Sequence, residues 1–245
     1  MRKKIIFILV GHGSRNSETI KEFNTFQKKV LEKIPNLNWG FGFLEYSEPS
    51  IEKIISKMVA QNPEKIVLVP LFLFSSKHVK KDLPKVLQNF EYTKFVLLDS
   101  FKINYSLINL LTQRIKESSG SKKKMRALVV VGRGAKDENS NEQFQKIVRI
   151  VEKKLDFDYI FPTFIGITKP KLEDSLKNLA KTGYEEIVVV PYLLFTGFLI
   201  NKIKTTLGIF SKENPSIEII YTPHLGVHPL LIQAVEEKIK NYRLP

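Results

Sequence analysis

The stretch Ile66-Val67-Leu68-Val69-Pro70 is repeated 121 positions later as Ile187-Val188-Val189-Val190-Pro191. The same offset separates Gly11-His12-Gly13 from Gly132-Arg133-Gly134. No gap is needed between the first glycine and the last proline of either copy, and chance rarely produces such agreement. The repeat therefore indicates a duplicated domain.

Each half of the chain alternates short apolar runs with amphipathic segments. Residues 4–10 form an apolar run of strand length, and residues 17–31 carry apolar side chains at helical spacing. This alternation predicts parallel sheets with helices on both faces. We therefore expect an α/β fold of two tandem, three-layer αβα lobes with a cleft between them, over residues 1–119 and 125–245. The small, polar and charged residues 118–124 are expected to link them.

Composition restricts the possible chemistry. The chain of 245 residues contains no cysteine, which excludes disulfides and thiolate metal ligands. Its net charge of +14 is shared by both halves, which suits a polyanionic ligand or a lysine-rich solvated surface. We find no nucleic-acid-binding motif and no apolar run of the ~20 residues that span a bilayer. The N-terminal apolar run is too short for a signal peptide and leads into a turn, so we expect a cytoplasmic protein without nucleic-acid or membrane partners.

Three polar residues of the first half are missing from the second. Each follows a predicted strand, and parallel strands bring their carboxyl ends to one edge of a sheet, where ligands bind. Imidazole and carboxylate groups bind divalent metals and transfer protons near neutral pH. Alone, each residue is as well explained by a structural role, but their joint loss from one copy favours a functional site. The replacements are His12 by Arg133, Glu45 by Gly166, and His78 by Leu199.

Two other patterns are weaker. The Gly-His-Gly-Ser-Arg segment could hold a phosphate at a helix N-terminus with Arg15 as a clamp, but it lacks the glycine spacing of known nucleotide loops. His224 and His228 have the spacing of a helical metal pair. Gly226 and Pro229 argue against a continuous helix there, so we expect a loop and no catalytic metal site.

The motifs resemble those of the sirohydrochlorin chelatases of the CbiX type, within the class II chelatase superfamily. The matching pieces are residues 11–15, Phe43-Leu44-Glu45 followed by Glu48-Pro49-Ser50, and residues 69–74 leading to His78. The similarity extends over both copies, as in the long, internally duplicated form of the family.

The resemblance implies insertion of Co²⁺ or Fe²⁺ into sirohydrochlorin, on the route to cobalamin or siroheme. The metal would be a substrate, and no tightly bound cofactor is expected. His12 and His78 would bind the metal and accept pyrrole protons, with Glu45 as a further ligand or proton acceptor. The lysine-rich surface would attract the polycarboxylate macrocycle. The residues expected to contact this substrate are Ser14, Arg15, Ser75, Ser76 and Arg133.

We expect a monomer whose two lobes are related by a pseudo-two-fold axis, with the active site in the first lobe. A non-catalytic tetrapyrrole or metal carrier of the same fold is the alternative. A nucleic-acid-binding module is suggested by charge alone.

Overall fold

A computed structural model describes residues 4–75, 78–91, 94–118 and 125–243. The expected linker at residues 119–124 lies outside these ranges, as does Ser76. The chain forms two compact units, each built around a four-stranded parallel sheet. The expected α/β class with a parallel sheet in each half is confirmed.

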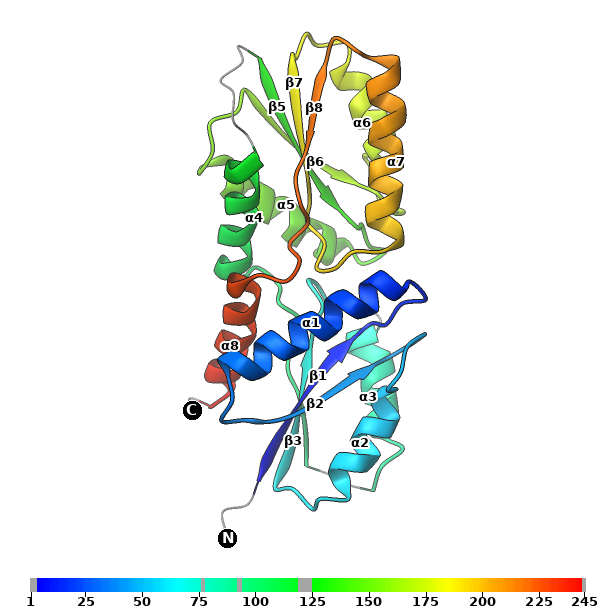
Figure 1. Cartoon of the computed structure of the whole chain (residues 1–245), viewed down its shortest axis with the longest axis vertical. Coiled ribbons are helices and arrows are strands. Elements are labelled where there is room, and N and C mark those ends of the chain that lie inside the picture. The colour runs from blue at the N-terminus through cyan, green and yellow to red at the C-terminus, as the bar shows by residue number, and fades with distance from the viewer. Residues whose placement is uncertain (1–3, 76–77, 92–93, 119–124, 244–245) are drawn as a thin grey trace. The chain divides into compact units, whose positions relative to one another are not determined.

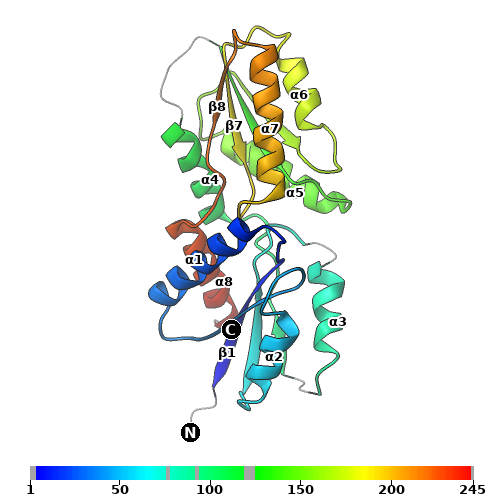
Figure 2. The same ribbon diagram turned by 45° about the vertical axis from the view of Figure 1, so that its right-hand side comes forward.

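The first unit contains the sheet β2-β1-β3-β4. Helices α2 and α3 cover one face of this sheet, and α1 and α8 lie on the other (Figures 1 and 2). Its strands and helices, in chain order, are β1 (Ile5–Gly11), α1 (Ser17–Lys33), β2 (Asn38–Phe43), α2 (Ile51–Val59), β3 (Lys65–Pro70), the π-helix η1 (His78–Asp82), α3 (Leu83–Leu87), β4 (Phe95–Leu97) and, from the end of the chain, α8 (Pro229–Arg243).

The second unit repeats this plan with the sheet β6-β5-β7-β8. Helices α6 and α7 pack on one face, and α4 and α5 on the other (Figure 1). Its elements are α4 (Tyr105–Ser118), β5 (Arg126–Gly132), α5 (Glu138–Glu152), β6 (Tyr159–Phe164), α6 (Leu172–Leu179), β7 (Glu186–Pro191), α7 (Phe198–Glu213) and β8 (Glu218–Tyr221).

Strand pairs that are 121 residues apart in the sequence have the same hydrogen-bond register in the two sheets. Ile6 pairs with Ile66 in the first sheet, and Ala127 pairs with Ile187 in the second. The central strands are buried on both faces, which explains why their sequences are continuous apolar runs rather than alternating ones. Corresponding prolines also share a geometry, since the Glu48–Pro49 and Lys169–Pro170 peptide bonds are both cis.

The compact units do not follow the consecutive boundaries expected from the sequence. The first consists of residues 1–102 and 231–245, and the second of residues 103–230. Helix α4 therefore belongs with the second sheet, where Lys154 Nζ donates to Asn109 Oδ1 at 2.9 Å. Helix α8 belongs with the first, where Lys238 Nζ donates to the carbonyl oxygen of Pro70 at 2.8 Å. An apolar helix face does not encode which of two similar sheets it covers, so the sequence could not show this exchange.

The turn after β1 ends at the N-cap of the following helix. Asn16 precedes α1 in an extended conformation, and its side chain accepts a hydrogen bond from Glu18 N. Phe23, Phe26 and Val30 then anchor the helix in the core. Within the described ranges, no helix combines the length and hydropathy needed to cross a membrane.

Candidate active site at the carboxyl edge of the first sheet

Three loops leave the carboxyl edge of the first sheet and carry the residues expected to be functional. They follow β1, β2 and β3, which are parallel neighbours in the order β2-β1-β3. The loop after β1 starts with His12, the loop after β2 contains Glu45, and the loop after β3 leads to His78 at the start of η1. The topology thus brings three segments from distant parts of the sequence to one edge.

The loops after β1 and β2 are joined through their backbones. Leu44 N donates to Gly11 O at 3.0 Å, and Glu45 N donates to His12 O at 2.9 Å. Gly13 has a φ of +91°, and a Cβ placed on it would lie 1.6 Å from Glu45 O. Only glycine permits this approach, so the turn of His12 is locked against the turn of Glu45.

The ring of His12 is half-buried between two aromatic side chains. Its centroid lies 6.4 Å from that of Tyr46, with the rings nearly parallel, and 6.2 Å from that of Phe72. His12 Nδ1 is 3.3 Å from Gly13 O. In the tautomer that donates this hydrogen bond, the lone pair is on Nε2, the atom that would take a metal or a proton.

Tyr46 connects His12 to Arg15. The guanidinium carbon of Arg15 lies 5.0 Å from the centroid of the Tyr46 ring, while Arg15 itself is exposed. Tyr46 is 59% exposed and adopts a φ of +60°, which is uncommon for a residue with a side chain. We did not select Tyr46 from the sequence, where its only signal was its position beside Glu45.

Two of the expected substrate contacts have partners inside the protein. Ser14 Oγ accepts a hydrogen bond from Asn16 N at 3.0 Å. Ser47, which we did not select, accepts from Ser14 N at 2.8 Å and donates to Ser14 O at 2.9 Å, so it joins the first two loops. Ser75 is 9% exposed, and its hydroxyl lies 3.1 Å from that of Ser100. These serines therefore stabilise the loops in this structure.

The structure describes the side chains of two of the three expected metal ligands. His12 and Glu45 lie on neighbouring loops, whereas the side chain of His78 and all of Ser76 are outside the described part of the chain. Within that part, no three His, Asp or Glu side chains come together closely enough to hold a metal ion.

The second sheet has the same edge without the reactive groups. Gly166 N donates to Arg133 O at 2.8 Å, as Glu45 N does to His12 O. A Cβ on Gly166 would lie 2.2 Å from Arg133 O, so this tighter turn has no room for a glutamate. Arg133 is exposed, and Leu199 lies in the first turn of α7. The two units thus differ at this turn both in residue type and in backbone geometry.

The expectation of a loop at His224 and His228 is confirmed, because α8 begins only at Pro229. His228 Nδ1 accepts a hydrogen bond from Leu230 N at 3.2 Å and so satisfies a backbone donor in the first turn of α8. Burial, assisted by the charge of Arg114, lowers the pKa of His228. A neutral ring that accepts from the backbone has a structural role.

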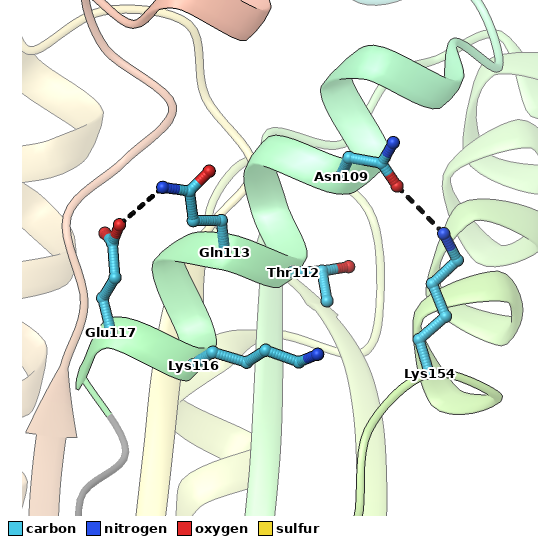
Figure 3. A pocket seen from close by; sticks show the side chains of 6 residues that line it. All are labelled: Asn109, Thr112, Gln113, Lys116, Glu117 and Lys154. Atoms are coloured by element: carbon cyan, nitrogen blue, oxygen red, sulfur yellow. Dashed lines mark hydrogen bonds between the residues drawn. The ribbon is translucent and has the colours of Figure 1, made fainter.

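A pocket of about 470 Å³ lies elsewhere, between α4 and the end of α5 (Figure 3). Its polar side chains pair with one another: Lys154 with Asn109, and Gln113 Nε2 with Glu117 Oε1 at 2.7 Å. None of the residues expected to be functional lines it. We place the candidate site at the carboxyl edge of the first sheet, because the residues expected to be functional lie on the loops there.

Comparison with known proteins identifies one family over both halves of the chain. The CbiX family model matches residues 6–118 and, a second time, residues 127–242. A sirohydrochlorin cobaltochelatase of Priestia megaterium is 26% identical over 244 residues, covering 96% of this chain and 78% of the relative. A sirohydrochlorin ferrochelatase of the same organism is 27% identical over 237 residues, covering 95% and 88%.

The fold matches that of solved structures over nearly its full length. SirB from Bacillus subtilis with Fe³⁺ superposes with a TM-score of 0.84 at 26% identity, covering 97% of this chain and 95% of that one. SirB from Bacillus subtilis subspecies spizizenii in complex with cobalt has the same fold, with a TM-score of 0.80 at 24% identity, and covers 97% and 94%.

Proposed function

The chain belongs to the CbiX family, and we propose that it is a sirohydrochlorin chelatase that inserts Co²⁺ or Fe²⁺ into the macrocycle. The observation that carries the proposal is the locked pair of turns presenting His12 and Glu45 at the carboxyl edge of the first sheet. Relatives that match nearly the whole of this chain and are named as cobaltochelatase and ferrochelatase support the same activity.

The reaction exchanges two pyrrole N–H protons for one divalent cation. The site must therefore accept protons and bind the cation while it loses part of its water shell. His12 is suited to the first task, because an imidazole has a reference pKa of about 6.5 and is largely neutral at physiological pH. Its Nε2 receives a pyrrole proton, and His78 and Glu45 share the binding of the metal and of the second proton.

Tyr46 and Arg15 shape the surface beside His12. The exposed Tyr46 ring stacks nearly parallel to the imidazole and offers a flat face to a planar macrocycle. Arg15 lies over Tyr46, where its guanidinium can pair with a peripheral carboxylate. Ser14 and Ser75 act by holding their loops, while Ser76 and Arg133 stay predicted contacts of the substrate.

The same residues suit both metals. Imidazole and carboxylate groups bind Co²⁺ and Fe²⁺, and selectivity between such ions often follows their supply. The metal is a substrate, and the protein requires no resident cofactor. We further propose that the enzyme acts in the cytoplasm as a monomer, without nucleic-acid or membrane partners.

The test is an anaerobic insertion assay. Purified protein is mixed with sirohydrochlorin and then with Co²⁺ or Fe²⁺, and the visible spectrum is followed against a control without enzyme. We expect acceleration that falls by roughly 10²–10⁴-fold in H12A and in H78A, the usual contribution of a general base. H224A is the matched control and should retain full activity.

The alternative of a carrier gives a different result. A carrier would bind the macrocycle, as followed by its absorbance or fluorescence, without accelerating insertion of either metal. Binding of the macrocycle without faster metal insertion would therefore contradict the proposal that the protein is an enzyme.

A further inference from the structure

Helix α8 places a lysine where two neighbouring strands of the first sheet end. Lys238 Nζ donates to the carbonyl oxygen of Pro70, the last residue of β3, at 2.8 Å. The same nitrogen lies 4.6 Å from the centroid of the Phe101 ring, close enough for a cation–π interaction. Phe101 is buried and follows β4, which pairs with β3. A single ammonium group therefore joins the segments that leave β3 and β4.

Both contacts of Lys238 lead to Phe72. Phe72 is the second residue after Pro70, and its carbonyl oxygen accepts a hydrogen bond from Phe101 N at 2.8 Å. Two further bonds join the same pair of segments: Lys102 N donates to Leu73 O at 2.8 Å, and the hydroxyls of Ser75 and Ser100 lie 3.1 Å apart. Lys238 thus restrains the backbone of Phe72 from Pro70, along the chain, and from Phe101, across the two segments.

Phe72 is one of the two aromatic neighbours of His12. The centroids of the Phe72 and His12 rings are 6.2 Å apart, and Phe72 is 9% exposed. The other neighbour, Tyr46, is 59% exposed. A buried ring in a packed interior has few alternative positions, so Phe72 rather than Tyr46 sets where the imidazole lies. A short series of contacts therefore runs from Lys238 to His12.

The second unit has a cation at the equivalent place but gives it a different partner. Helix α8 begins 124 residues after α4, and Lys238 follows Arg114 by the same interval. Arg114 Nη2 donates to Leu225 O at 3.1 Å, and its Nη1 lies 3.8 Å from Glu117 Oε2. Lys238 forms no ion pair within the described residues. The cation without a paired carboxylate is thus in the unit that carries the reactive residues.

Lys238 is not the residue that stability alone would favour. Burial of its ammonium group, opposed by the charge of Asp99, lowers the pKa of Lys238 to about 7. Asp99 itself pairs with Lys102 at 2.8 Å. An apolar side chain of similar size would avoid the burial of a charge and often stabilises a fold at such a position. A residue that stability does not favour is typical of a site under functional constraint.

We propose that Lys238 is a positioning residue for metal insertion, which fixes the segment after β3 so that Phe72 holds the imidazole of His12 in place. The proposal rests on the proposed function, because it assigns the reaction to the site of His12. Lys238 acts through Pro70, Phe101 and Phe72 and not on the substrate. The same segment continues to η1, which begins at His78, so its placement bears on two of the expected ligands.

The test uses K238M in the intact chain. Methionine fills a similar volume without a buried charge, so at neutral pH the melting temperature should stay within about 3 °C of the parent value or rise. In the insertion assay kcat should fall at least about tenfold, because a displacement of about 1 Å at a catalytic group can cost ~100-fold. The KM values for the macrocycle and the metal should stay within about twofold, since no binding group is removed.

A spectroscopic readout follows His12 directly and needs no turnover. The chain is labelled with ¹³C-histidine, and the ring signal of His12 is identified among those of the four histidines by its absence from H12A. Aromatic ring currents shift the signal of a neighbouring ring, so a displaced Phe72 changes the chemical shift of His12. We expect K238M to move this signal and to leave those of His224 and His228 in place.

Two control variants separate positioning from loss of charge and from loss of stability. K240M makes the same substitution two residues further along α8, at an exposed lysine that pairs with Glu236. I55V removes one methyl group from a buried side chain of α2 and should lower the melting temperature by roughly 2–5 °C. Both variants should keep the parent kcat and the parent signal of His12.

Four outcomes would overturn the proposal: an unchanged kcat in K238M, an unmoved His12 signal, an equal fall of kcat in K240M or I55V, or a large fall in the melting temperature of K238M, which would assign Lys238 a structural role instead. If the parent chain inserts no metal, the chelatase assignment fails, and the His12 signal still decides whether Lys238 positions the ring.

Discussion

Replacing Gly13 by alanine tests whether the locked turns create the active site. Gly13 has a φ of +91°, and the new Cβ would lie 1.6 Å from Glu45 O and 2.8 Å from Glu45 C. The obstacle is backbone rather than the end of a flexible side chain. The turn of His12 and the turn of Glu45 must therefore move apart.

The size of the movement follows from packing distances. Non-bonded heavy atoms settle at about 3.5 Å, so the two turns must separate by roughly 2 Å. A displacement of about 1 Å at a catalytic group can cost ~100-fold in rate. We expect kcat for metal insertion to fall at least that far. The left-handed backbone alone should lower the free energy of unfolding by about 1–2 kcal/mol.

The control variant is G183A. Gly183 has a φ of +81°, but nothing lies within 4 Å of its Cβ position. G183A should therefore show the backbone cost in a urea denaturation curve and keep its turnover. Circular dichroism establishes that both variants are folded before the insertion assay. Turnover in G13A within threefold of the parent value would refute the idea that contact between these turns positions His12 and Glu45.

Three further predictions concern stability and are checked by urea denaturation. R126M should lower the free energy of unfolding by about 3–5 kcal/mol, because Arg126 Nε pairs at 2.7 Å with the fully buried Glu186 and the variant removes this cation; R126M/E186L should recover most of the loss. S47A removes the hydroxyl that both accepts from and donates to the backbone of Ser14, so it should cost about 1–3 kcal/mol, and a change within error would contradict this role. Burial lowers the pKa of Lys238 from 10.5 to about 7 in the folded chain. Between these two pH values the unfolded chain therefore binds more protons than the folded chain, and the free energy of unfolding should rise with pH. K238M should flatten this rise.

The sequence was sufficient to predict the strands and the duplication, because residue type, spacing and repetition encode them. Apolar runs predicted buried strands, and the strands at Ile5–Gly11 and Lys65–Pro70 are buried on both faces. The offset of 121 predicted a second copy, and the two sheets have the same strand order and register. Parallel topology then placed the loops of His12 and Glu45 at one edge.

Other features needed the folded chain. Ser47 and Tyr46 were not selected, because a hydroxyl that joins two loops and a ring that stacks on an imidazole leave no periodic signal. The contact of Lys238 with both Pro70 and Phe101 depends on how α8 packs against the first sheet.

The sequence by itself determined the elements, their duplication and the loss of reactive groups from one copy, since these follow from residue type and spacing. Only the tertiary structure decided that α4 belongs with the second sheet and α8 with the first. Each helix has an apolar face that either sheet could bury. The choice between them is made by long-range contacts, such as that of Lys238 with Pro70, which no local pattern records.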